Sequence, residues 1–124
     1  MRATLTFPAG TTFYGTGEVA GPLERSGRTV TLWNTDAMPY DEASTLYQSQ
    51  PYVLALLPDG RALGLLADTI RRGTIAIDSR VVTFAFEEEP YDLYCIEGAH
   101  PREVSQALGA LVGRIALPPL WALG

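Results

Sequence analysis

The chain has 124 residues, of which 47% are hydrophobic and 19% are charged, and this balance is typical of one globular domain with a single hydrophobic core. Its formal net charge is −5, and every positive side chain is an arginine. An acidic chain lacks the clustered cations that phosphate groups require, so we expect no nucleic-acid partner.

Cys95 is the only cysteine, which excludes an intrachain disulfide, and its place in an apolar run predicts a small buried side chain. No apolar run approaches the length of a membrane span, and the N-terminus lacks the basic and apolar segments of a signal peptide. We therefore expect a soluble, cytoplasmic protein that does not contact a membrane.

Alternating apolar residues predict three strands in the first part of the chain, at residues 4–7, 11–14 and 29–33. Gly15 and Gly17 follow the second of these strands. A phosphate-binding loop would need wider glycine spacing and a helix after it, whereas Pro22 and Gly27 follow here. The two glycines therefore predict positive φ angles and a close approach of two backbones.

The third strand is followed by a connection that runs on to Pro51, far longer than the few residues that usually join paired strands. It carries Trp33, Asp36, Tyr40 and Tyr47 together with amide and hydroxyl side chains. Aromatic rings can stack on the C–H face of a polyol while carboxylates and amides bind its hydroxyls, which indicates a carbohydrate-binding loop. An Ω-loop packed on its own aromatic side chains is an equally weighted alternative.

The second half of the chain predicts two hairpins and a last strand. Residues 52–57 and 62–67 flank the turn Pro58–Gly60, and residues 73–77 and 81–86 flank the turn Asp78–Arg80. The last strand is expected at residues 91–96. Between these elements, the acidic run Glu87–Glu89 is expected to be solvated rather than to bind a metal.

One helix is expected after His100, because Pro101 suits a first helical turn and Glu103 is favourable near the N-terminal end of the helix dipole. Apolar residues from Val104 to Val112 recur at intervals of three and four, and Gly113 is a natural end. His100 is the only histidine, and we expect it to cap the helix rather than to act as a general base. The chain offers no ligand set for zinc, and we expect no metal and no cofactor.

Strands joined in hairpins, with one late helix, predict an all-β fold, namely an antiparallel β-sandwich. The segment Leu117–Gly124 is apolar, although the ends of most domains are polar. We therefore expect the sandwich and its closing helix over residues 1–113, and a linker that begins a further domain over residues 114–124.

Five segments form a recognisable series, and they are Phe13–Glu18, Gly21–Leu23, Thr31–Ala37, Leu46–Pro51 and Leu117–Gly124. In this order they resemble the N-terminal region of glycoside hydrolase family 31, which consists largely of α-glucosidases with α-xylosidases and related enzymes. The resemblance implies a sandwich of the galactose-mutarotase-like type, placed before a (β/α)8 barrel. It also implies that residues 114–124 begin this catalytic barrel, which is missing from the present chain.

The resemblance implies a parent enzyme that is a retaining, α-glucosidase-like hydrolase with both catalytic carboxylates on the barrel. The nucleophile of this family typically belongs to a Trp-x-Asp-Met-Asn-Glu motif, and no such motif occurs in this chain. We therefore expect no catalytic residue here. The implied role of the sandwich is to contribute its long loop to a pocket that binds an α-linked oligosaccharide.

Within that loop, the resemblance implies that Asp36 contacts the sugar on the leaving-group side. Met38 stands where some relatives carry a hydroxyl residue, and Tyr47 and Tyr40 are weaker candidates. The substrate-binding residues expected from the sequence are thus Asp36, Met38 and Tyr47. Trp33 is favoured as a core residue or loop anchor over a platform for a sugar.

Two classes of function stay open: a non-catalytic domain that completes the pocket of a glycosidase in cis, and a free-standing carbohydrate-binding or interaction sandwich. The continuation of the reading frame past Gly124 into a chain with the catalytic motif would distinguish them. An aldose epimerase would need His and Glu acid–base partners, which a single His at a helix start does not supply. Family members often self-associate, which leaves a homo-oligomer open.

Overall fold

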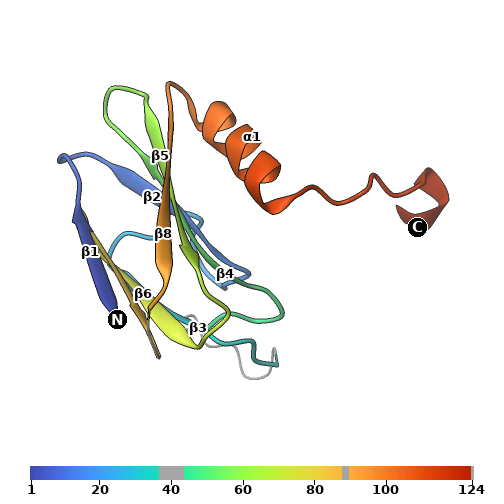
Figure 1. Ribbon diagram of the computed structural model, residues 1–124, viewed down its shortest axis with the longest axis horizontal. Coiled ribbons are helices and arrows are strands. Elements are labelled where there is room, and N and C mark those ends of the chain that lie inside the picture. Colours follow the sequence, from blue (N-terminus) through green and yellow to red (C-terminus); the bar gives the residue numbers. More distant parts are fainter. Residues whose placement is uncertain (37–43, 88–89, 124) are drawn as a thin grey trace.

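The computed structural model describes residues 1–36, 44–87 and 90–123, which form two layers of strands with a helix beside them (Figure 1). The strands are β1 (Arg2–Thr6), β2 (Thr12–Gly17), β3 (Arg28–Leu32), β4 (Ser49–Leu56), β5 (Ala62–Asp68), β6 (Gly73–Asp78), β7 (Val81–Phe86) and β8 (Asp92–Gly98). They are followed by α1 (Pro101–Val112) and a 3-10 turn at Leu120–Leu123. Each strand overlaps a segment that the alternating pattern predicts.

The strands form two four-stranded sheets, with the orders β1-β7-β6-β3 and β2-β4-β5-β8, and all of their pairings are antiparallel. The hairpins β4–β5 and β6–β7 each lie within one sheet, whereas β1 and β2 belong to different sheets. The same is true of β3 and β4. The predicted antiparallel β-sandwich is confirmed, and the long connection after β3 leads from one sheet to the other.

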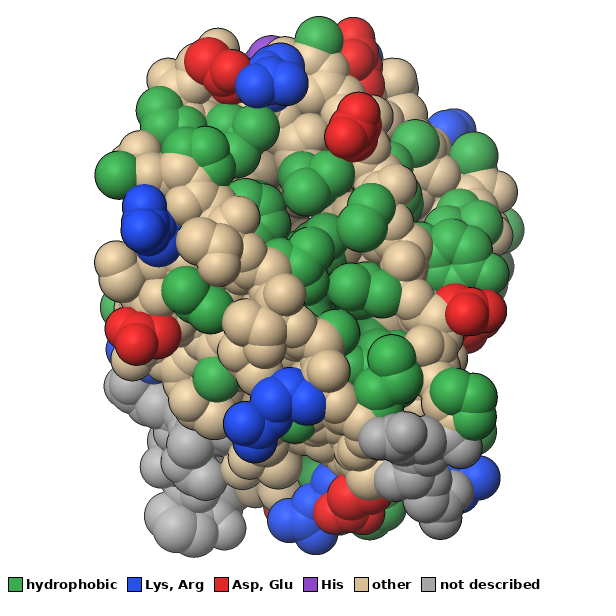
Figure 2. Space-filling view, turned by 60° about the vertical axis from the view of Figure 1, so that its left-hand side comes forward, with side chains coloured by type: hydrophobic (Ala, Val, Ile, Leu, Met, Phe, Trp, Pro, Cys, Tyr) green, Lys and Arg blue, Asp and Glu red, His purple; other side chains and the backbone are tan. Residues whose placement is uncertain are grey.

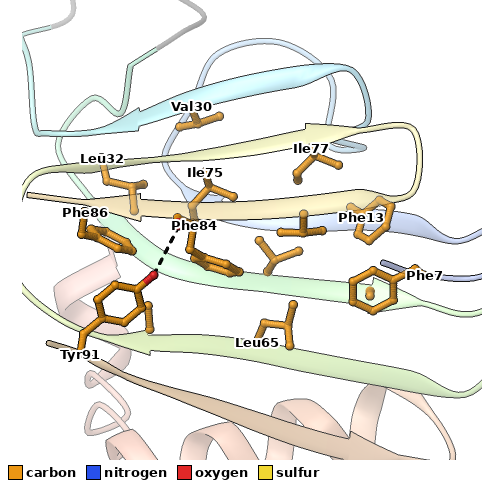
Figure 3. Packing of buried hydrophobic residues seen from close by; sticks show 14 residues of the cluster. Phe7, Phe13, Val30, Leu32, Leu65, Ile75, Ile77, Phe84, Phe86 and Tyr91 are labelled. Atoms are coloured by element: carbon orange, nitrogen blue, oxygen red, sulfur yellow. Dashed lines mark hydrogen bonds between the residues drawn. The ribbon is translucent and has the colours of Figure 1, made fainter. Parts of the chain in front are cut away.

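The core lies between the sheets, where alternating side chains of each strand meet. Ile75 of β6 and Phe84 of β7 face Phe13 of β2 and Leu65 of β5, and all four are fully buried (Figure 3). This period-two pattern is the one from which the strands were predicted. It fixes which face of each sheet is covered, because a shift by one residue would expose every core side chain.

Aromatic pairs close both ends of this core. The rings of Phe7 and Phe13 meet edge to face with centroids 5.2 Å apart, and those of Phe86 and Tyr91 do so at 5.1 Å. The Tyr91 hydroxyl donates a hydrogen bond of 3.4 Å to the Phe84 carbonyl (Figure 3). Tyr91 can therefore be buried, because its hydroxyl has a hydrogen-bond partner inside the core.

Both predicted hairpin turns are present. Gly60 has a φ of 88°, and its N–H donates to the Leu57 carbonyl at 3.0 Å, which closes the turn between β4 and β5. Ser79 has a φ of 54° at the tip of the β6–β7 hairpin. Short polar side chains are among the residues that tolerate such turns.

Gly15 and Gly17 have φ angles of 111° and 100°, as predicted. A Cβ on Gly15 would lie 2.6 Å from the Tyr52 carbonyl oxygen, and one on Gly17 would overlap the Gln48 carbonyl oxygen. The register between β2 and β4 shifts between the two glycines, which makes this a β-bulge. The bulge brings the end of β2 against the residues that lead into β4.

Helix α1 begins as predicted, because the His100 side chain accepts a hydrogen bond of 3.2 Å from the Arg102 N–H at Nδ1. Val104 is fully buried and lies against Gly64 of β5, where a Cβ would be only 2.7 Å from the valine side chain. The helix thus packs on the outer face of the β2-β4-β5-β8 sheet at a position that must lack a side chain. This explains why a glycine interrupts the apolar run of β5.

Beyond Val104, the described part of the chain covers the predicted apolar stripe on α1 only in part, at the half-buried Leu108. Leu111 and Val112 are exposed, and so are Ile115, Leu117 and Trp121 in the segment that extends away from the sandwich (Figure 1). None of the helices among the described residues is long and apolar enough to span a membrane.

The surface differs from the sequence prediction at Cys95, which is exposed rather than buried. Cys95 is paired in register with the buried Leu65, so both belong to the same sheet face, but β8 is the outermost strand and the other sheet does not cover it. Figure 2 shows hydrophobic side chains gathered in the middle of one face, with acidic and basic side chains separated around them. That face offers apolar contact area rather than a patch of one charge.

Candidate functional site

The long connection between β3 and β4 is described as two arms. The first arm is residues 33–36, and the second arm is residues 44–48. Met38 and Tyr40, which the sequence names as candidates, lie outside the described residues. The geometry of the candidate site therefore concerns Asp36, Tyr47 and Trp33.

Thr45 joins the two arms at their base, and its side chain is 0% exposed. Its backbone N–H donates to the Thr31 carbonyl at 3.1 Å, which fixes the second arm on β3. Its carbonyl accepts from the backbone N–H of Thr35 at 3.1 Å and from the Thr35 hydroxyl at 2.9 Å. Its own hydroxyl oxygen accepts from the Trp33 N–H at 3.1 Å. Two oxygen atoms of one residue therefore hold the first arm.

Side-chain hydrogen bonds continue from Thr45 toward Tyr47. Thr45 Oγ1 lies 2.6 Å from Ser49 Oγ, and Ser49 donates to Asn34 Oδ1, also at 2.6 Å. Asn34 then donates from Nδ2 to the Tyr47 carbonyl at 2.9 Å. Because Ser49 has a single hydroxyl proton and uses it on Asn34, Thr45 is the donor toward Ser49. All these hydrogen bonds thus run in one direction across the loop base.

Asp36 and Tyr47, which the sequence names separately, are brought together by the structure. The Tyr47 hydroxyl donates to Asp36 Oδ1 at 2.9 Å, and both side chains are exposed. A carboxylate has about four acceptor sites, so one phenol does not exhaust its capacity to accept hydroxyl hydrogen bonds. The pair joins the outer end of the first arm to the second arm.

Glu18, which follows the β-bulge of β2, forms hydrogen bonds to the second arm. The Glu18 N–H donates to the Gln48 carbonyl at 2.9 Å, and the Glu18 carbonyl accepts from the Leu46 N–H at 2.8 Å. The Glu18 carboxylate accepts from the Tyr47 N–H at 3.3 Å. One residue just after the two glycines therefore contacts three consecutive residues of the second arm.

Arg25 fixes the bulge itself. Its side chain is buried, and it donates from Nε to the Gly15 carbonyl at 3.4 Å and from Nη1 to the Pro22 carbonyl. Burial lowers the pKa of Arg25 from its ordinary value, and the nearby charge of Arg28 adds to the effect. Backbone carbonyl oxygens thus accept the hydrogen bonds of this buried cation.

A cavity of about 480 Å³ opens beside the first arm, within the size range of small-molecule pockets. Its wall combines aromatic, aliphatic and polar side chains, and consists of Leu32, Trp33, Asn34, Ser49, Pro51, Thr69, Ile70, Arg71 and Phe86. Asn34 and Ser49 contribute both to this wall and to the hydrogen bonds of the loop base. Asp36 and Tyr47 do not line the cavity, so the pair and the cavity are separate features.

Trp33, expected as a core residue or a loop anchor, does not lie in the core. Its side chain is 52% exposed, and the Arg72 guanidinium lies 5.6 Å from the ring centroid, within the range of a cation–π contact. The ring follows β3 at the point where the alternation ends, so it is not directed between the sheets. Its backbone N–H does anchor the loop, through Thr45.

No pattern in the sequence indicates directly that Thr45, Ser49 and Asn34 organise the loop base. Small polar residues in a long loop read as solvent-exposed, and only contacts between distant positions reveal that Thr45 is buried. The one usable signal is the Asn34–Asp36 segment, in which an amide and two further polar side chains immediately follow an apolar strand. Among the described residues, no group of three or more His, Cys, Asp and Glu side chains could hold a metal ion.

Two antiparallel sheets and a long polar connection between them define a β-sandwich domain. The sequence matches the family model of the glycosyl hydrolase 31 N-terminal galactose mutarotase-like domain over residues 1–75. The chain belongs to this family, and the resemblance that the motifs indicate is confirmed.

Relatives of the chain are much longer proteins. It is 38% identical over 116 residues to alpha-glucosidase 2 of Bacillus thermoamyloliquefaciens, a match that covers 90% of this chain and 15% of the relative. An alpha-xylosidase of Emericella nidulans is 27% identical, with 98% of this chain and 15% of the relative covered. The crystal structure of a family 31 alpha-glucosidase from Bacteroides thetaiotaomicron superposes with a TM-score of 0.90 at 37% identity, over 99% of this chain and 21% of that one.

Proposed function

We propose that this chain is the non-catalytic N-terminal domain of an α-glucosidase-like retaining glycoside hydrolase, and that its long loop completes the pocket for an α-linked oligosaccharide. Family membership supports the first part. The observation that carries the second is the pair of Asp36 and Tyr47, an exposed carboxylate held by a phenol at 2.9 Å. Charged acceptors held in place in this way are suited to sugar hydroxyls.

The proposed role of the loop is to bind the sugar on the leaving-group side of the scissile bond. Met38 is proposed as a further contact, and Tyr47 acts both on the sugar and as the support of Asp36. The test compares two substrates of the full-length protein, with and without Asp36. One is a disaccharide, whose leaving group carries hydroxyls, and the other is an aryl glycoside, whose leaving group does not. If Asp36 recognises the leaving group, its removal must lower kcat/KM more for the disaccharide than for the aryl glycoside.

The isolated chain of 124 residues is expected to hydrolyse neither maltose nor 4-nitrophenyl α-glucoside. A retaining glycosidase needs two carboxyl groups about 5 Å apart, one as nucleophile and one as acid. The expected motif of the nucleophile does not occur in the sequence. Release of glucose or nitrophenol is compared with a mock purification. Turnover above that background, retained in an Asp36→Ala variant, would contradict this view because it would place the chemistry on other carboxylates of the chain.

The proposed partner in cis is a (β/α)8 catalytic barrel, for which residues 114–124 form the linker and the first part. The chain covers only 15% and 21% of the length of its relatives, which leaves room for such a domain. The exposed apolar side chains from Leu111 to Trp121 would be the contact area. Domains of one chain commonly bury surfaces of this kind against each other.

Apolar residues exposed in this way are expected to make the isolated chain self-associate. Contiguous apolar patches promote contacts between molecules, and Ile115 and Leu117 are almost fully exposed. Light scattering should detect dimers or larger species for residues 1–124, and fewer for a chain that ends at Arg114. A monomer with the apolar segment intact would count against a docking role for that segment. The cytoplasmic location and the oligomeric state of the full-length protein remain predictions.

A further inference from the structure

We propose that Thr45 is a positioning residue whose hydroxyl sets the place of Asp36, and that it thereby determines how well the enzyme recognises the leaving-group sugar. This inference rests on the proposed role of Asp36. It adds a residue that does not touch the sugar but acts through the two arms of the loop. Its evidence is the burial of Thr45 and the direction of the hydrogen bonds around it.

Thr45 holds the arm that carries Asp36. Asp36 is three residues beyond Trp33, and both Trp33 and Thr35 are held by oxygen atoms of Thr45, at distances of 2.9 to 3.1 Å. Since Thr45 is itself tied to β3 through Thr31, it connects the first arm to the sheet. The start of the first arm therefore cannot move without breaking a contact to Thr45.

Tyr47, the partner of Asp36, is also linked to the Thr45 hydroxyl. The Thr45 hydroxyl donates to Ser49, Ser49 donates to Asn34, and Asn34 donates to the Tyr47 carbonyl. Hydrogen bonds in such a series polarise one another, so the loss of one member weakens the next. The Thr45 hydroxyl therefore contributes to the position of both members of the Asp36–Tyr47 pair.

The hydroxyl of Thr45, rather than the volume of its side chain, has this role. Thr45 Oγ1 accepts from the Trp33 N–H at 3.1 Å and donates its single proton to Ser49 Oγ at 2.6 Å. A valine has nearly the same shape but leaves the Trp33 N–H and the Ser49 hydroxyl, whose bonds to Thr45 are partly buried, without this partner. A serine keeps the oxygen and loses only the methyl group.

The test uses the full-length protein and a set of matched variants. We expect Thr45→Val to lower kcat/KM for a disaccharide roughly three- to tenfold, the effect of about one net hydrogen bond, with a smaller change for an aryl glycoside. Thr45→Ser should retain the wild-type ratio of kcat/KM for the two substrates. Hydrogen exchange over residues 31–36 should be faster in Thr45→Val than in the wild-type protein.

Thr11→Val is the control, because Thr11 is also buried and also uses its hydroxyl, in a 2.8 Å bond to the Pro8 carbonyl. Thr11 adjoins the end of β2 opposite to Gly17, so its variant should change neither the substrate ratio nor exchange over residues 31–36. A Thr45→Val protein with wild-type exchange over residues 31–36 overturns the inference. The inference is also overturned if Asp36→Ala alters the ratio of kcat/KM for the two substrates but Thr45→Val does not. In that case the proposed function of Asp36 stands. If Asp36→Ala itself leaves the ratio unchanged, then the role of Asp36 fails, and with it the specificity role of Thr45.

Discussion

Replacing Asp36 by alanine in the full-length protein is expected to reduce kcat/KM for a disaccharide about ten- to hundredfold. The protein would lose the hydrogen bonding of sugar hydroxyls to a charged group, which is worth about 1.5–3 kcal/mol in total, and this loss is felt in the transition state. An aryl glucoside should lose much less, because its leaving group offers no comparable hydroxyls. Steady-state kinetics on both substrates measures the difference.

Asp36→Asn separates recognition from loop structure, since the amide keeps one acceptor oxygen but not the charge. The Tyr47 hydroxyl can still donate to that oxygen, so the loop should stay ordered while recognition weakens. The melting temperature of each variant is the control. Equal losses on the two substrates, together with a lower melting temperature, would mean that Asp36 only stabilises its own loop.

Gly17→Ala is expected to destabilise the domain by about 2–5 kcal/mol. The left-handed backbone at a φ of 100° costs an alanine roughly 1–2 kcal/mol, and crowding in a packed site adds roughly 1–3 kcal/mol. The crowding arises because the new Cβ would overlap the Gln48 carbonyl oxygen and lie 2.9 Å from the Gln50 nitrogen. Urea unfolding of the 124-residue chain, followed by circular dichroism, measures the change.

Gly27→Ala is the matched control for this prediction. Gly27 also has a positive φ, 75°, but nothing lies within 4 Å of the position that its Cβ would take. This variant should therefore show the backbone cost alone. If both variants lose the same stability, the close approach of β2 and the second arm contributes nothing measurable.

The sequence predicted the strands, the hairpin turns and the caps of α1, because each depends on neighbouring residues. The alternation of Ile75 and Ile77 defines a strand with one covered face, and Pro58 with Gly60 defines a turn. Beyond the two hairpins, the sequence did not predict which strands pair, since a period of two is the same whichever sheet a strand joins. β1 and β2 follow each other in the chain and yet lie in different sheets.

In the candidate site, too, individual residues could be predicted from the sequence, but their contacts could not. Asp36 and Tyr47 could be named from the family likeness, but their contact depends on two arms that are distant in sequence. The exposure of Cys95 follows from the outer position of β8, which no local pattern reports. The sequence did not predict a role for Thr45, because its burial results from the path of the loop rather than from its residue type.

The path of the second arm has a consequence for solubility. β3 is the last strand of its sheet, and such a strand presents unpaired peptide groups on which a strand of another molecule can add. Here Ser44 forms a parallel bridge with Thr31, and the Thr45 N–H donates to the Thr31 carbonyl. The second arm thus shields the edge of β3 at Thr31. Grafting a new tip that keeps Ser44 and Thr45 should leave the edge shielded, whereas shortening the loop through these residues would open it to aggregation by strand addition.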